Sequence, residues 1–129
     1  MKEPEGRIEA PLGRSRTDRK KMAVDPEGRP AVTEWRVLSE GRGCTLLDVR
    51  ILTGRTHQIR VHLKSVHHPV CGDPLYGMER GVKVPCLMLH AYSLAFEHPR
   101  TRQKMTFQAP LPEDFLKGLK SNGVGIPDP

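Results

Sequence analysis

The hydrophobic residues of this chain follow a period of two in several short runs, which is the spacing of half-buried strands. Residues 44–52 alternate, with Asp48 and Arg50 directed to the face opposite the aliphatic side chains. The run 32–38 before it is rich in β-branched and aromatic residues, and a short glycine-bearing turn joins the two. The pattern predicts an antiparallel hairpin over residues 32–52. Its inward positions on the second strand are Leu47, Val49 and Ile51.

The C-terminal third predicts a second hairpin, followed by a short helix. Residues 87–96 begin as an apolar turn and run into a strand, 97–102 form a turn, and 104–109 form the returning strand with Met105 and Phe107 inward. A short helix then starts at Pro112, with Phe115, Leu116 and Leu119 as its core face. These elements predict an α+β fold with a largely antiparallel or mixed sheet and a few short helices.

Residues 56–67 change from strand spacing to helix spacing. Gly54 permits the turn out of the preceding strand, Thr56 is placed to cap the helix, and Pro69 ends it. The i, i+4, i+7 stripe predicted to be buried is Ile59, Leu63 and Val66. The opposite face carries His57, Arg60 and Lys64.

Cations crowd the start of this helix. Arg55, His57 and Arg60 lie in or beside its first turn, where positive charge opposes the helix dipole and costs up to about 1 kcal/mol each. A carboxylate or phosphate brought to Arg60 from elsewhere is the simplest compensation. Two plainer interpretations stay open: Arg60 as a structural ion-pair partner, and His57 as a capping or packing residue.

Composition places the chain among small basic proteins. Its 129 residues suit a single domain with a real core, and its net charge of +6 favours polyanionic partners such as nucleic acid. No apolar run of membrane-spanning length occurs, and the N-terminus lacks the apolar core of a signal peptide, so a cytoplasmic protein is expected. Residues 1–30 are expected to be a basic arm or loop, and 121–129 a flexible tail.

The densest basic run is residues 13–21, with five cations against one aspartate. It is typical of a solvated loop, and equally of an arm that contacts phosphates. Its candidate contacts are Arg14, Arg16, Arg19, Lys20 and Lys21.

The cysteines and histidines do not predict a metal site. Cys44, Cys71 and Cys86 are widely spaced, which fits neither a disulfide framework nor a zinc motif. His57 and His62 are five residues apart, so their side chains diverge around a helix by about 140°. We therefore expect no metal.

Three blocks, in this order, resemble the RluA/RluD-like pseudouridine synthases, which isomerise uridine in RNA. They are Arg19–Val24, Thr53–Gly77 and Leu89–Pro99. The resemblance implies the C-terminal half of that family's catalytic fold, an RNA substrate (ribosomal or transfer RNA), and no cofactor.

The resemblance also implies roles for individual residues. The arginine at the position of Arg60 pairs with the catalytic aspartate and holds it in place, and the basic run, with Lys64, lies near the RNA. The positions implied to support the pocket are Arg55, His57, Gln58, Asp73 and Tyr76.

Two family motifs are missing from these residues: the His-Arg-Leu-Asp motif with the nucleophile, and the Lys-x-Tyr motif with the stacking tyrosine. The aspartates present are not expected to replace the nucleophile. We therefore expect residues 1–129 to be one partial catalytic domain, inactive alone, whose partners are RNA and either the missing N-terminal half or a second copy. The alternative is a non-catalytic RNA-binding module. A third interpretation, a small zinc protein, is testable by metal analysis.

Overall fold

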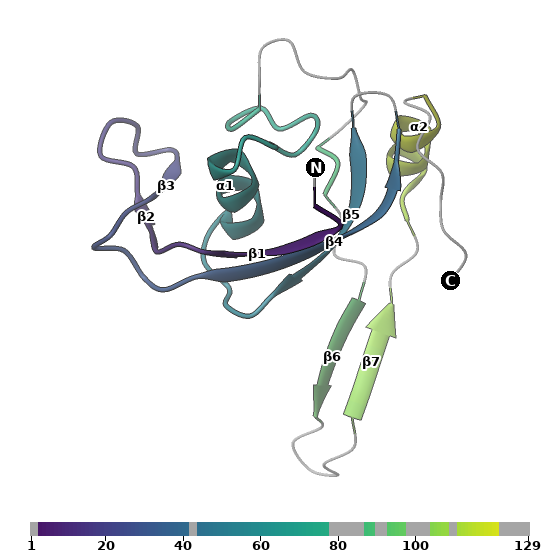
Figure 1. Ribbon diagram of the computed structural model, residues 1–129, viewed down its shortest axis with the longest axis horizontal. Helices are drawn as coiled ribbons and strands as arrows, with labels where there is room; N and C mark the ends of the chain where they lie inside the picture. The colour runs from purple at the N-terminus through teal and green to yellow at the C-terminus, as the bar shows by residue number, and fades with distance from the viewer. Residues whose placement is uncertain are drawn as a thin grey trace.

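Three antiparallel strands form the main sheet of the computed structural model. β4 (Val32–Glu40) lies in the middle, with β1 (Glu5–Glu9) on one side and β5 (Thr45–Ile51) on the other. Figure 1 shows β4 as a long, curving strand, and it extends past β1 at its C-terminal end. The hairpin predicted over residues 32–52 is confirmed. The structure describes residues 3–41, 44–77, 87–89, 93–97, 104–108 and 111–121.

The outer strand β5 is less buried than its alternating sequence predicted. Leu47 packs against the core cluster of Ile8, Leu63 and Val70. Ile51, however, is 47% exposed, so its expected inward position is wrong. It is the last residue of β5, and no hydrophobic cluster of the described residues includes it.

Residues before β4 contain more regular structure than the expected arm or loop. Besides β1, β2 (Leu12–Arg14) and β3 (Met22–Val24) pair as a small antiparallel hairpin whose tip is the basic run. Leu12 is 2% exposed and packs with Ala31, Val61 and Tyr76. The hairpin is therefore fastened to the rest of the molecule at its base, and it projects beside α1 in Figure 1.

Helix α1 (Gln58–Ser65) is shorter than the predicted helix 56–67 and turns a different face inward. Leu63 is buried as predicted and Ile59 packs at the edge of the same cluster, but Val66 is 37% exposed, so that part of the stripe is wrong. The buried face of the helix consists of Gln58, Val61, His62 and Leu63. Two of these are polar, which a stripe drawn from apolar residues alone does not include.

The remaining elements, one hairpin and one helix, are not part of the main sheet. β6 (Ser93–Glu97) pairs with β7 (Lys104–Gln108) as a two-stranded hairpin, as predicted, and α2 (Glu113–Ser121) buries Phe115 and Leu119 against Leu46 and Met88. Glu97 of the predicted turn 97–102 belongs to β6, and Ser121 of the predicted tail 121–129 belongs to α2. The rest of both segments and the inward directions of Met105 and Phe107 lie outside what the structure describes.

Candidate active site

The turn that leads from β5 into α1 is held by the side chain of Gln58. Its Oε1 atom accepts hydrogen bonds from the Thr53 hydroxyl at 2.7 Å and from the Arg55 N–H at 3.1 Å. The residue that caps the helix is His57, not Thr56, so the predicted cap is wrong. Gln58 reaches back across the turn and accepts the Arg55 N–H, while the helix itself begins without a side-chain cap bond.

A chain of buried hydrogen bonds continues from Gln58 through the helix to the first strand. The Gln58 Nε2 amide donates to Thr33 Oγ1 at 3.0 Å and to the Val32 carbonyl at 2.8 Å. Thr33 Oγ1 lies 2.7 Å from Nδ1 of His62, whose Nε2 lies 2.9 Å from the Ala10 carbonyl. A carbonyl only accepts, so His62 Nε2 carries a proton and its Nδ1 accepts from Thr33.

This chain fixes α1 on the sheet with little freedom. Thr33 and His62 are 0% exposed and Gln58 is 3% exposed. No buried side-chain nitrogen or oxygen atom in the described part of the molecule lacks a partner. A fully satisfied buried network specifies one arrangement, because every displaced group would lose a bond it cannot regain from water. Thr33, Thr53 and His62 were not predicted as site residues, although they position those that were.

Arg60 and Asp73 form a two-pronged ion pair. Arg60 Nε lies 2.8 Å from Asp73 Oδ2, and Arg60 Nη2 lies 2.8 Å from Asp73 Oδ1. Arg60 thus bonds a carboxylate of this chain, whereas the resemblance implied only the family's catalytic aspartate as its partner. Of the interpretations left open for Arg60, the structural ion pair is the one observed.

The pair is strongly sequestered from solvent. The Asp73 side chain is 0% exposed and that of Arg60 is 14% exposed. Oδ1 of Asp73 also accepts the N–H groups of Leu75 and Tyr76, at 2.9 and 3.1 Å. Burial acts to raise the pKa of Asp73, but the hydrogen bonds from Arg60, Tyr76 and Leu75 outweigh it and hold the pKa at about 2. The hydrogen bond to Asp73 raises the pKa of Arg60 in turn.

One edge of the Arg60 guanidinium is not used by the ion pair with Asp73. The group has five N–H donors, and the bonds to Asp73 use Nε and one hydrogen of Nη2. Within the residues that the structure describes, Nη1 makes no hydrogen bond. The edge formed by Nη1 and Nη2 retains the spacing that suits a second carboxylate or a phosphate.

Three side chains on the polar face of α1 contact the ring of Tyr76. The Arg60 guanidinium carbon lies 5.2 Å from the ring centroid and Lys64 Nζ lies 5.9 Å from it, both within cation–π range. His57 contacts the ring edge-on, at 5.6 Å between centroids. The predicted common face of His57, Arg60 and Lys64 is confirmed, and all three side chains contact the Tyr76 ring.

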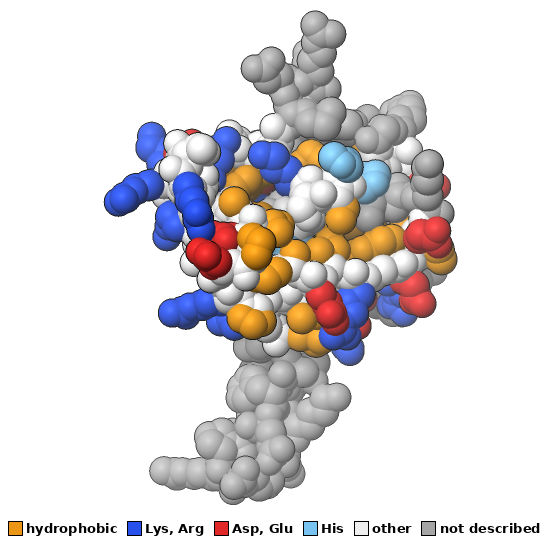
Figure 2. Space-filling model, turned by 60° about the vertical axis from the view of Figure 1, so that its left-hand side comes forward, with side chains coloured by type: hydrophobic (Ala, Val, Ile, Leu, Met, Phe, Trp, Pro, Cys, Tyr) orange, Lys and Arg blue, Asp and Glu red, His pale blue; other side chains and the backbone are white. Residues whose placement is uncertain are grey.

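The phenol of Tyr76 joins this face to the basic hairpin. Its oxygen accepts the N–H of Met22, the first residue of β3, at 2.8 Å. The cations of the hairpin tip are thereby anchored next to α1. Figure 2 shows Lys and Arg side chains gathered over the side of the molecule where the hairpin projects.

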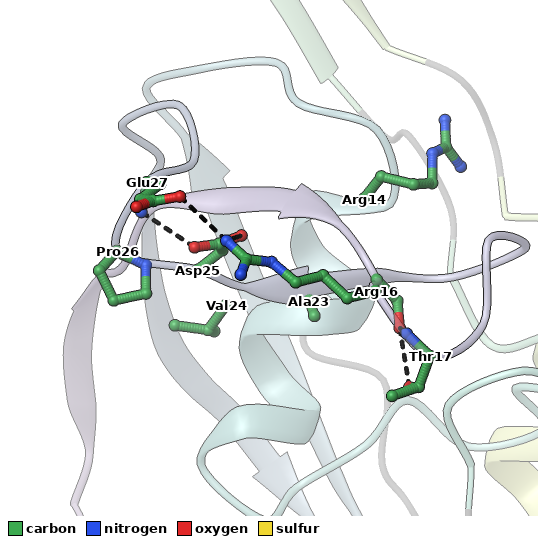
Figure 3. A pocket seen from close by; sticks show the side chains of 9 residues that line it. Arg14, Arg16, Thr17, Ala23, Val24, Asp25, Pro26 and Glu27 are labelled. Atoms are coloured by element: carbon green, nitrogen blue, oxygen red, sulfur yellow. Dashed lines mark hydrogen bonds and ion pairs between the residues drawn. The ribbon is translucent and has the colours of Figure 1, made fainter.

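The five cations of the basic run are not equivalent. Arg16 bonds Glu27 at 2.9 Å and lies 3.5 Å from Asp25, so its charge is largely matched inside the hairpin. In Figure 3, Arg16 reaches across to these carboxylates while Arg14 points away from them. These side chains line an open groove of about 500 Å³. Within the described residues, no ion pair involves Arg14, Arg19, Lys20 or Lys21.

Arg55 differs from Arg60 in what it contacts. Its Nε donates to the Pro30 carbonyl at 2.9 Å, an exposed bond between the turn and the segment before β4. A single neutral acceptor gives it a supporting role in the turn, whereas Arg60 has a buried anion.

Other kinds of site are not seen in the described residues. These contain no group of three or more His, Cys, Asp or Glu side chains placed to hold a metal ion. Nor does either described helix have the length and apolar character needed to cross a membrane.

Comparison with known proteins places this geometry in a family. Residues 1–65 match the RNA pseudouridylate synthase family. The chain is 44% identical over 122 residues to the uncharacterized RNA pseudouridine synthase YlyB of Bacillus subtilis, covering 92% of this chain and 40% of that protein. It is 43% identical over 127 residues to ribosomal large subunit pseudouridine synthase D of Nitrosomonas europaea, covering 92% of this chain and 37% of that protein.

The fold agrees with the sequence match. The solved structure of human RNA pseudouridylate synthase domain containing 1 superposes with a TM-score of 0.76 at 30% identity, covering 87% of this chain and 50% of that one. The chain spans about two fifths of the length of the two bacterial relatives. The family match, the identity and the common fold lead to one conclusion: the chain belongs to the RNA pseudouridylate synthase family, as its RluA/RluD-like motifs implied.

Proposed function

We propose that this chain supplies the arginine-bearing, RNA-facing part of a pseudouridine synthase active site, and that the nucleophilic aspartate comes from polypeptide outside these 129 residues. The observation that carries the proposal is the clamped guanidinium of Arg60. Asp73 occupies its Nε–Nη2 edge, which leaves the Nη1–Nη2 edge to receive a second carboxylate. Residues 1–129 form one partial catalytic domain in this proposal.

The proposed reaction needs this arrangement. The aspartate carboxylate attacks C1′ as the uracil N1–C1′ bond breaks, and the freed base turns. Its C5 then displaces the carboxylate from C1′, the proton on C5 is lost and N1 gains one. A guanidinium at the carboxylate keeps it ionised and fixes its direction. Asp73 cannot take this role itself, because its side chain is fully buried and each of its oxygens accepts a bond from Arg60.

Arg60 is thereby proposed as the catalytic partner, and the residues around it as pocket support. Gln58 holds the turn, Asp73 clamps Arg60, and Tyr76 underlies the cations. Arg55 and His57 complete the predicted set. No metal or cofactor enters the proposal.

A reconstitution experiment tests the catalytic part. The chain alone should form no pseudouridine, and activity should appear when an N-terminal half carrying the His-Arg-Leu-Asp motif is added, in cis or as a separate chain. In the restored enzyme, Arg60→Ala should lower kcat by at least about a hundredfold, the size of losing one preorganised charge at the reacting group. Arg60→Lys should fail nearly as badly, because a point charge cannot bond two carboxylates through a planar fork.

Arg55→Ala is the matched control, since among the described residues the Arg55 side chain bonds only the Pro30 carbonyl. It should retain most activity. Isomerisation by the chain alone, or near-full activity of Arg60→Ala in the restored enzyme, would contradict the proposal.

The basic hairpin supports RNA as the partner. The proposal places the protein in the cytoplasm, with ribosomal or transfer RNA as the class of substrate. The ribosomal-RNA enzyme among the relatives favours the former. Phosphate contacts make binding salt-dependent, with each contact contributing about 0.7 to the slope for single strands. Replacing Arg14, Arg19, Lys20 and Lys21 by Ser should therefore lower the slope by about 3, whereas Arg16→Ser should change it little because Asp25 and Glu27 already match its charge.

A non-catalytic RNA-binding module is the second candidate, favoured by the same unmatched cations of the hairpin. The reconstitution separates the two. RNA binding without any isomerisation by the chain, whether with the N-terminal half added or as a self-associated species, would favour the module.

A further inference from the structure

The hydrogen bonds of the Tyr76 phenol determine the protonation of His57. Tyr76 is 2% exposed, and its oxygen accepts the Met22 N–H at 2.8 Å while lying 2.8 Å from His57 Nδ1. The phenol hydrogen needs an acceptor in this buried position. Among the described residues, His57 Nδ1 is the acceptor that the structure places there. Nδ1 therefore accepts, and the proton of the neutral ring resides on Nε2.

The charges around His57 favour this neutral ring. Burial lowers the pKa of His57, and the charge of Arg60 and, more weakly, that of Arg14 act in the same direction, against an opposing effect of Asp73. The imidazole is thus uncharged at neutral pH. Its Nε2–H makes no hydrogen bond to the part of the chain that the structure describes.

The backbone of His57 is held in a costly conformation. Its φ is 54° and its ψ is 23°, in the left-handed region that residues other than glycine rarely adopt. Such conformations persist where the surroundings impose them, and they concentrate at functional sites. Here the phenol bond and the edge-on contact with the ring fix the imidazole at the start of α1, between the hairpin and the cations Arg60 and Lys64.

We propose that His57 is an RNA contact residue whose neutral imidazole donates Nε2–H to an oxygen of the RNA, with Tyr76 fixing the tautomer that makes it a donor. The flanking cations favour a phosphodiester oxygen over a uracil carbonyl. The proposal rests on the proposed RNA function and adds to it a specific donor, held ready before the RNA arrives. It also explains why Tyr76 bonds both the hairpin and His57. Through these two bonds, the distance between the hairpin cations and the His57 donor is held fixed.

Nitrogen NMR of the free chain tests the tautomer without any RNA. Long-range ¹⁵N–¹H correlations should show His57 protonated on Nε2 and free on Nδ1 at pH 7. In Tyr76→Phe this preference should weaken, because the donor to Nδ1 is gone. An Nδ1–H tautomer in the wild-type chain would overturn the proposal.

RNA affinity tests the contact. His57→Gly removes the imidazole and the acceptor of the Tyr76 phenol, but it also relieves the left-handed backbone, which offsets part of that loss, so this variant should still fold. Its affinity for an oligouridylate should fall about tenfold, the size of one hydrogen bond to a charged group. His67→Gly is the matched control, since His67 is also left-handed (φ 68°) but exposed at the opposite end of α1, and it should bind as wild type.

An abasic oligomer identifies the acceptor. An equal loss on oligouridylate and abasic RNA indicates a phosphate oxygen, and a loss on oligouridylate alone indicates a uracil carbonyl; either result supports His57 as a donor. Unchanged affinity of His57→Gly on both probes overturns the inference while leaving the proposed function intact. Failure of the wild-type chain to bind either probe would overturn both.

Discussion

Replacing Asp73 by Asn should remove both a large part of the stability and its dependence on acid pH. The wild-type carboxyl has its pKa lowered from 3.8 to about 2. That difference of about 1.8 in pKa, at about 1.36 kcal/mol for each pKa unit, is worth about 2 kcal/mol. Because the folded-state pKa is the lower one, this stability is fully present above about pH 5 and is lost as the pH falls toward 2.

The substitution itself should cost more than this, about 3 to 5 kcal/mol at neutral pH. The Asn amide can turn its oxygen toward the N–H groups of Leu75 and Tyr76, but its NH₂ then faces Arg60 Nε, donor against donor. The guanidinium, 14% exposed, is left without its counter-ion, which is the costly way to break a buried pair. With a total stability of about 5 to 15 kcal/mol for a typical domain, such a variant would be marginal.

Urea titration followed by fluorescence provides the assay, because the chain has a single tryptophan, Trp35, which packs at the edge of the Ile8 and Leu63 cluster. Asp48→Asn is the control, since Asp48 and Arg36 form an exposed pair at 3.4 Å whose loss should cost less than about 0.5 kcal/mol. The reasoning is refuted if Asp73→Asn is no more destabilising than Asp48→Asn, or if it keeps the wild-type acid dependence.

Three further outcomes follow from other features. Thr33→Val should cost about 2 to 5 kcal/mol in urea titrations by leaving Gln58 Nε2 and His62 Nδ1 short of a partner, while Thr45→Val on the outer strand should cost little. Gly77→Ala should destabilise by about 1 to 3 kcal/mol, because a Cβ there overlaps the backbone oxygen of Asp73, whereas Gly54→Ala meets nothing within 4 Å and should be tolerated. Elemental analysis of the purified protein should find no stoichiometric zinc, and a chelator should leave the thermal midpoint unmoved; one zinc per chain would contradict our interpretation of the histidines.

The elements that were predicted correctly are those whose signals are local. Alternation over residues 32–52 and the apolar face at Phe115 and Leu119 depend only on neighbours in the sequence, and both elements form as expected. The common face of His57, Arg60 and Lys64 was found for the same reason, since helical spacing fixes it without knowledge of the partner.

The buried face of α1 could not be found in this way. Gln58 and His62 count as polar in any hydrophobic pattern, and they are inside only because Thr33, Val32 and Ala10 provide their hydrogen bonds. Those partners lie 25 to 52 residues away in the sequence. One signal was present: two polar residues, Gln58 and His62, stand at i and i+4, on a helix whose outer face already carries His57, Arg60 and Lys64. This signal can be interpreted only once the partner strand is known.

The partner of Arg60 was missed because it depends on a reversal of the chain. The helix stops at Ser65, and left-handed residues at His67 and Gly72 turn the chain back so that Asp73 comes beneath the helix. The resemblance implies only a pocket-support role for Asp73, and it is this reversal that brings its carboxylate to Arg60.

The bond between the Tyr76 phenol and Met22 has a consequence for how the protein is assembled. It joins positions 54 residues apart, and the bond from His62 to Ala10 spans 52. During synthesis residues 1–30 are made before both partners, so β1 can pair with β4 early, but the β2–β3 hairpin cannot make its bond to Tyr76 until residue 76 is available. Closing such long loops is slow, since their entropy is lost before the contacts form. The basic hairpin thus reaches its final position only after residue 76 has been made, and until then its cations are open to nearby polyanions.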